Sequence, residues 1–139
     1  MNKESQLIEI LKAHNLRITP VRKEVLSLFL NQDVAISHGD IERSIDEIDR
    51  ITLYRTLKSF EEKGIIHKAV DGTDVAKYAL CEAHCNDTHH NDNHVHFHCE
   101  KCGNTFCIED IEIPGIRDVD GYIVKSTHMV LSGMCKKCN

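Results

Sequence analysis

The sequence predicts an α+β fold, in which an N-terminal winged helix-turn-helix precedes a small mixed α/β unit that binds metal. Two features indicate this fold. In residues 1–80, helical spacing of apolar residues gives way to two short extended stretches, which is the element order of a winged helix. Residues 81–139 hold all 7 cysteines and 7 of the 10 histidines, so the chain changes character near Cys81.

Composition narrows the class of protein further. A chain of 139 residues, 41% hydrophobic and 28% charged, fits one domain or two small lobes and disfavours a disordered chain. No apolar run approaches the roughly 18 residues of a membrane helix, and residues 1–10 lack a signal peptide's apolar core, so we expect a cytoplasmic protein. An odd number of cysteines in that reducing compartment favours metal binding over disulfides. The net charge of −5 argues against a general nucleic-acid coat.

Four helices and a hairpin are predicted in the first half. The helices cover residues 3–14, 20–30, 37 to 45 or 48, and 51–63. Thr19 can cap the second helix with Pro20 in its first turn, and Asp49 or Thr52 can cap the fourth, which ends at Gly64. Extended stretches 65–70 and 75–80 are joined through the turn signal at residues 71–72.

The fourth predicted helix carries polar side chains opposite its apolar face. A short helix followed by a helix with such an exposed first turn is the arrangement that places side chains in a DNA major groove. Arg17 lies ahead of the second helix, where it could reach a phosphate or a narrow minor groove. The predicted DNA-contacting residues are Arg17, Arg22, Thr52, Tyr54, Arg55 and Lys58. The alternatives are a solvated charged face and, for Tyr54, a core aromatic.

Two Cys-x-x-Cys pairs predict a structural metal site. Cys99 with Cys102, and Cys135 with Cys138, each supply one edge of a tetrahedral thiolate site, and four thiolates suit zinc. The 32 intervening residues exceed the usual spacing, so the metal would join the start of this half to its end. We expect a closed zinc site without catalytic water. The alternative is two unrelated knuckles or redox pairs.

A second group of ligand-type side chains surrounds the first pair. His94, His96 and His98 alternate with apolar residues, so a strand would place all three imidazoles on one face. Further candidate ligands lie in the hairpin, after it, in the following strand and near the end of the chain: His67, Cys81, Cys107 and His128. The stretch 81–93 is a predicted linker loop rich in histidine and cysteine, in which the roles of His84, Cys85, His89 and His90 stay open.

The chain resembles the ferric uptake regulator family of metal-responsive bacterial repressors over nearly its full length. The matching motifs are Leu16-Arg-Ile-Thr-Pro-Val-Arg22, Thr52-Leu-Tyr-Arg-Thr-Leu57, Gly64-Ile-Ile-His67, His94-Val-His-Phe-His-Cys-Glu-Lys-Cys-Gly103 and Gly133-Met-Cys-Lys-Lys-Cys138. The resemblance implies a homodimer with a winged-helix domain (1–80), a hinge loop (81–93) and a metal-binding dimerisation domain (94–139). It also implies a structural zinc in the four cysteines and a sensing metal between the domains, which sets operator affinity.

The resemblance is strongest to the zinc uptake regulators. The iron and peroxide sensors carry a carboxylate where this chain has Cys81, and a histidine near Ala35. The implied sensing ligands are His67, Cys81, His94 and His96, and one thiolate with three imidazoles suits zinc.

The chain departs from the family pattern at two places. Cys107 stands in place of a usual carboxylate, so any additional metal site has altered ligands, drawn from His98, Cys107, His128, His89 and His90. The segment 111–121 is too short, and too broken by Pro114 and Gly115, for the family's long dimerisation helix. The dimer interface should therefore differ in detail.

The expected function is that of a zinc-responsive repressor of zinc-uptake genes, binding a palindromic operator in double-stranded DNA as a dimer. We expect no membrane partner and no small-molecule substrate. We also expect no enzymatic activity, because the zinc-deaminase signature is absent. The alternatives are an iron- or peroxide-responsive regulator of the same family and, in a different class, a metal-storage or delivery protein favoured by the His-rich loop.

Overall fold

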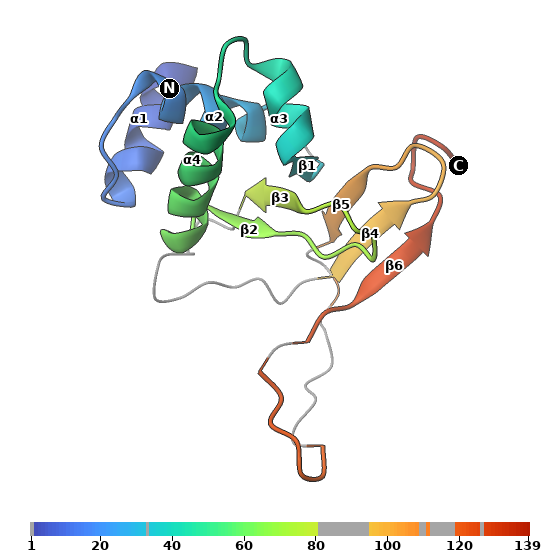
Figure 1. The fold of residues 1–139 in the computed structure, drawn as a ribbon. Helices are drawn as coiled ribbons and strands as arrows, with labels where there is room; N and C mark the ends of the chain where they lie inside the picture. The colour runs from blue at the N-terminus through green and yellow to red at the C-terminus, as the bar shows by residue number, and fades with distance from the viewer. Residues whose placement is uncertain (1, 33, 81–94, 109–110, 112–118, 126) are drawn as a thin grey trace.

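Four helices and six strands build the computed structural model, which describes residues 2–32, 34–80, 95–108, 111, 119–125 and 127–139 (Figure 1). The helices are α1 (Lys3–Ala13), α2 (Pro20–Leu30), α3 (His38–Ser44) and α4 (Arg50–Glu62). The strands are β1 (Ile36–Ser37), β2 (Ile66–Lys68), β3 (Lys77–Leu80), β4 (Val95–Cys99), β5 (Thr105–Ile108) and β6 (Val130–Gly133). The predicted α+β class is confirmed. Below, residues 2–80 are called the N-terminal lobe and residues 95–139 the C-terminal lobe.

Helix starts follow the capping residues of the sequence. Thr19 accepts a hydrogen bond from the backbone N–H of Arg22, with Pro20 in the first turn of α2, as predicted. Asp49, the first of the two predicted candidates, caps α4 by accepting from the N–H of Thr52. α3 ends at Ser44, earlier than predicted, because Ile45 is already extended.

The core of the N-terminal lobe draws one large apolar side chain or more from each helix. Leu11, Leu26, Ile41, Leu53 and Phe60 are all completely buried. Within a helix the buried residues recur at helical spacing, as Leu7 and Leu11 do in α1, so the four amphipathic faces meet over β2, where Ile66 is also buried. α4 is thereby fixed with its opposite face outward.

Replacing Phe60 by alanine should destabilise this lobe by about 3–5 kcal/mol, since the substitution removes a buried ring and leaves a cavity. Tyr54→Ala is the matched control on the same helix, because the Tyr54 side chain is 61% exposed. Urea unfolding of both variants measures the difference. Equal midpoints would contradict the assigned orientation of α4.

The first sheet has the strand order β1-β3-β2 with antiparallel pairing. β2 and β3 form the predicted hairpin but are shorter than predicted. β1 was not predicted: two residues are too few to show an alternating pattern, and they gain strand character only by pairing with Tyr78 and Lys77.

The second sheet has the order β5-β4-β6, in which β5 is antiparallel and β6 parallel to β4. The register places His96 opposite Cys107, and His98 opposite Thr105, with the Phe97–Phe106 pair between them. Because alternate residues share a face, the side chains of the two histidines, Cys107 and Thr105 lie on the same side of the sheet. That side faces the hairpin of β2 and β3, which is the wing of the winged helix.

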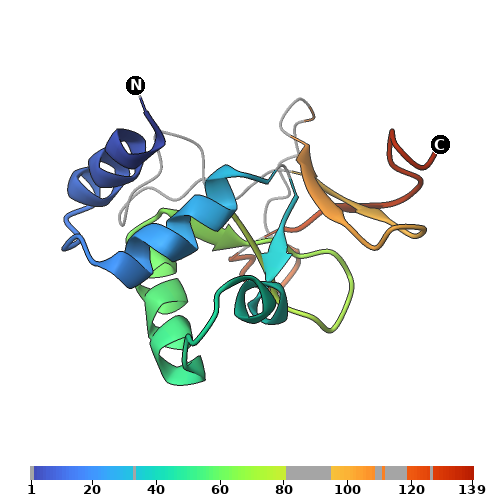
Figure 2. The same ribbon diagram turned by 90° about the horizontal axis from the view of Figure 1, so that it is seen from above.

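The two lobes are joined along β5. The backbone N–H of Ala35 donates to the carbonyl of Thr105 at 2.8 Å, and Val34 forms a bridge with Phe106. Seen from above, the helical part and the C-terminal sheet lie at opposite ends of the molecule, with the wing strands between them (Figure 2).

No helix in the described part of the chain is long and apolar enough to cross a membrane. The predicted linker 81–93, and residues 112–118 with the helix-breaking Pro114 and Gly115, lie outside the described residues.

Candidate metal centres and nucleic-acid interface

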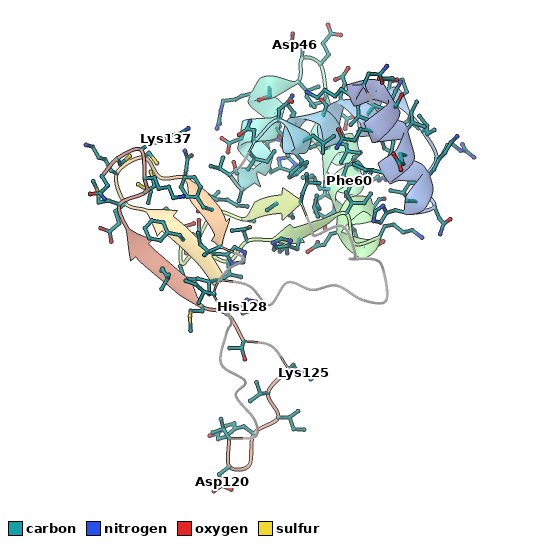
Figure 3. All side chains as sticks on the ribbon, turned by 180° about the vertical axis from the view of Figure 1, so that it is seen from behind. Asp46, Phe60, Asp120, Lys125, His128 and Lys137 are labelled. Carbon is teal, nitrogen blue, oxygen red and sulfur yellow. The ribbon has the colours of Figure 1, made fainter. Side chains whose placement is uncertain are left out.

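The four cysteines of the two Cys-x-x-Cys pairs converge at one end of the second sheet. Their Sγ atoms all lie within 4.8 Å of one another, and those of Cys102 and Cys135 are 3.9 Å apart. Zinc–sulfur bonds of about 2.3 Å directed to the corners of a tetrahedron place sulfur atoms about 3.8 Å apart. The sulfur atoms gather beside the labelled Lys137 in Figure 3. The predicted convergence is therefore present in the fold, and the donor set fits zinc.

Backbone amides prepare this cluster for a cation. The N–H groups of Cys102 and Cys135 point at the Cys99 sulfur at 3.5 and 3.4 Å, and these hydrogen bonds lower the pKa of Cys99 to about 6. The sulfur atoms around Cys138, Cys135 first, raise its pKa to about 12. The cluster therefore stabilises the thiolate form of Cys99 and disfavours that of Cys138. A divalent cation would offset the repulsion among the four thiolates.

A second cluster lies between the two lobes. The Nε2 atom of His67 on β2 lies 3.8 Å from the Sγ atom of Cys107 on β5, and the rings of His67 and His96 have centroids 5.8 Å apart. One ligand atom from each of His67, His96 and Cys107 falls within 4.8 Å of the others. Both histidines are buried, at 1% and 2% exposure. Two imidazoles and a thiolate at these separations are suited to bind a borderline-soft divalent metal.

Cys107 was predicted to be a ligand of an additional metal site, whereas the fold places it with His67 and His96. The signal that could have found this was the cross-strand register, since β4 and β5 put His96 opposite Cys107. Cys81 and His94, the other two predicted sensing ligands, fall outside the part of the chain that the structure describes, as do His89 and His90.

The remaining candidate ligands take other positions. His98 lies on the same face as His96, but its Nδ1 atom is 3.3 Å from the hydroxyl of Thr105 and is engaged there. His128 is exposed just before β6 and is labelled below the second sheet in Figure 3. Neither belongs to the two cysteine- and histidine-containing clusters found among the described residues.

The outer face of α4 carries the predicted DNA-contacting side chains. Tyr54, Arg55 and Lys58 are exposed, so the alternative of a core position for Tyr54 is wrong. Thr52 is half-buried, and its hydroxyl donates to the capping carboxylate of Asp49 at 2.7 Å. Thr52 therefore shapes the start of the helix and keeps an acceptor lone pair free for a partner.

Ile51 is a further exposed residue of α4, outside the predicted DNA-contacting set. Its side chain is 65% exposed in the first turn of α4, one helical turn from Arg55. An exposed isoleucine at that position can contact a thymine methyl group in a major groove.

The loop before α2 places two more basic residues. The guanidinium of Arg22 donates to the backbone carbonyl of Arg17 at 2.7 Å, which fixes the loop, while the Arg17 side chain is exposed. Arg17 is thus available to a phosphate, and Arg22 acts on the shape of the loop.

Comparison with known proteins identifies this assembly of winged helix, four-cysteine cluster and interlobe cluster. The model of the ferric uptake regulator family matches residues 13–132, most of the chain. The chain belongs to the ferric uptake regulator family. Members of this family are transcription regulators and not enzymes, which agrees with the sequence prediction.

The relatives of this family member carry different names. It is 31% identical to a "Ferric uptake regulation protein" of Bordetella parapertussis, with 92% of this chain and 93% of the relative covered. It is 33% identical to one of Staphylococcus aureus, with 94% of each covered. A solved structure, "Zinc Uptake Regulator Complexed With Zinc AND DNA", matches with a TM-score of 0.68 and 27% identity, covering 99% of this chain and 95% of that one. The chain is thus a metal-responsive regulator by family, with both iron and zinc regulators among its relatives.

Proposed function

We propose that this protein is a zinc-responsive transcriptional repressor that controls zinc-uptake genes. The observation that carries the proposal is the cluster of His67, His96 and Cys107, because it takes one ligand from the wing and two from the second sheet. An ion bound by all three residues connects the N-terminal lobe, which carries the proposed recognition helix α4, to the C-terminal lobe.

Zinc is the metal that this donor set favours. Two imidazoles and a thiolate are soft or borderline ligands, and His67 and His96 are buried away from water. No Asp or Glu belongs to the cluster as found in the described part of the chain. One further donor, from the predicted sensing ligands Cys81 and His94, would give the four ligands that zinc favours.

The mechanism that follows is a population shift. A metal ion biases an equilibrium only by its difference in affinity for two conformations, and ligands on both lobes supply that difference. In the metal-bound conformation the lobes are fixed relative to each other, and in a homodimer this sets the spacing of the two α4 helices. The expected operator is palindromic double-stranded DNA, because the protein dimer has two-fold symmetry.

The domain roles are part of the same proposal. Residues 1–80 bind DNA, 81–93 act as the hinge, and 94–139 bind metal and dimerise. Zinc in the four-cysteine site is structural, and the thiols of both sites fit a cytoplasmic protein.

Replacing His67 by glutamine should raise the free zinc needed for half-maximal DNA binding by at least tenfold, because one inner ligand is lost. The measurement is fluorescence anisotropy on DNA selected from a random pool by the zinc-loaded protein. Elemental analysis should show that the four-cysteine metal remains. His14→Gln is the matched control, since His14 caps the end of α1 and belongs to neither cluster. An unchanged zinc midpoint for His67→Gln would exclude His67 as a sensing ligand.

Iron or peroxide sensing is the main alternative, favoured by the ferric uptake names of the two curated relatives. It predicts that iron or manganese activates DNA binding at lower free concentration than zinc does. A metal-storage protein would bind several ions without gaining affinity for any DNA sequence.

A further inference from the structure

A buried carboxylate links the lobes beside the metal cluster. Asp71 sits in the turn between β2 and β3, and its side chain is 1% exposed. One carboxylate oxygen accepts from the hydroxyl of Thr105 on β5 at 2.6 Å and from the Lys77 ammonium at 2.9 Å. The other accepts from the N–H and hydroxyl of Thr73, at 2.9 and 2.6 Å. Asp71 therefore reaches from the wing into the C-terminal lobe.

Every charge in this group has partners on both lobes. The Lys77 ammonium also donates to the carbonyl of Gly103 at 3.0 Å and to the Thr105 hydroxyl at 3.1 Å, so three acceptors match its three protons. Burial alone raises the pKa of Asp71, but the hydrogen bonds from Thr105, Thr73 and Lys77 outweigh it and hold that pKa well below its usual range. We call Asp71, Thr73, Lys77 and Thr105 the interlobe network.

The interlobe network and the metal cluster occupy neighbouring positions on the same elements. Thr105 precedes the ligand Cys107 by two residues on β5, so both side chains project from one face. On the wing, Asp71 follows the ligand His67 by four residues. Between them, the backbone N–H of Ala69 donates a hydrogen bond to the carbonyl of Lys77 at 2.9 Å. Holding Asp71 against Thr105 thus holds β2 against β5 at the place where His67 meets Cys107.

We propose that the interlobe network is a metal-independent latch that pre-positions the sensing ligands and so sets the metal concentration at which the regulator switches. Asp71 is the positioning residue at its centre. Without the latch, the metal itself would have to bring the lobes together, and part of its binding free energy would be spent on that ordering. The inference rests on the proposed function, since it concerns the response of the same site.

Asp71→Asn tests the latch because the amide keeps the size of the carboxylate but removes the charge that Lys77 faces. Asp74→Asn is the matched control, in the same turn but exposed. The readout is DNA binding by the full-length protein over buffered free zinc. We expect Asp71→Asn to need about tenfold more zinc for half-maximal binding, while the DNA affinity at saturating zinc and the four-cysteine metal stay as in wild type. Asp74→Asn should match wild type.

A second variant tests the latch independently if Asp71→Asn fails to fold. Thr105→Val keeps the side-chain shape and removes the hydroxyl that donates to Asp71 and accepts from Lys77, so we expect a shift of at least threefold in the same direction. The two substitutions should be less than additive when combined, because they remove the same contact.

The outcomes separate the latch from the function on which it rests. An Asp71→Asn midpoint equal to that of Asp74→Asn overturns the latch, and so does lowered DNA affinity at saturating zinc with an unchanged midpoint, which is the result of a purely structural role. A wild-type protein that binds DNA equally well with and without any divalent metal overturns the proposed function, and the latch with it.

Discussion

Cys135→Ser should remove the metal from the four-cysteine site and unfold the C-terminal lobe. Cys135 is buried, and its Sγ atom lies 3.9 Å from that of Cys102, so the loss affects both Cys-x-x-Cys pairs. A structural zinc contributes roughly 10–16 kcal/mol of binding free energy, which is as large as the whole stability of an ordinary small domain. Elemental analysis should show one metal fewer per subunit, and circular dichroism should show loss of the second sheet's signal.

Cys107→Ser is the control for that experiment. The same chemical change is made on the same sheet, but Cys107 belongs to the interlobe cluster. The variant should keep the four-cysteine metal and its fold, and lose the metal response of DNA binding. If Cys135→Ser and Cys107→Ser lost the same metal and kept equal stability, the division into a structural and a sensing site would be wrong.

Arg55→Ala should weaken DNA binding by at least a hundredfold without changing metal content or stability. Arg55 is exposed on α4, beside Tyr54 and one turn from Ile51, on the face opposite the core. A bidentate arginine contact to a base contributes about 1–3 kcal/mol of discrimination, and loss of a phosphate contact adds to it. Anisotropy on the selected DNA at fixed salt measures the change.

Lys137→Ala is the matched control for charge. It removes one exposed positive charge from the C-terminal lobe, far from α4 (Figure 3). Its DNA affinity should stay within about twofold of wild type if binding is localised to the recognition helix, since distant charges are screened beyond about 10 Å. Equal losses for the two variants would indicate a general charge effect in place of a groove contact.

The N-terminal lobe could be predicted closely from the sequence because its signals are local. Thr19-Pro20 and Asp49 fix the starts of α2 and α4, and the apolar spacing fixes which face of each is buried. The convergence of the four cysteines was equally predictable, because both the ligand type and the Cys-x-x-Cys spacing are visible in the sequence. β1 was the exception in this lobe, since its strand character comes from pairing with β3 alone.

The interlobe features could not be read in the same way. That Cys107 joins His67 depends on how β5 packs against the wing, which is a long-range contact between residues 40 positions apart. Asp71 looked like an ordinary turn residue, and its burial against Thr105 follows from the same packing. Alternation along β4 predicted that His96 and His98 share a face, but only the register shows that one meets Cys107 and the other Thr105.

The most direct test of the central claim is a titration of wild-type DNA binding with zinc, iron and manganese at buffered free concentrations, paired with metal content per subunit. We predict one tightly held zinc that is present throughout, and a second that switches on DNA binding at the lowest free concentration of the three metals. Activation by iron or manganese, with zinc effective only in excess, would contradict the assignment of the interlobe cluster as a zinc sensor.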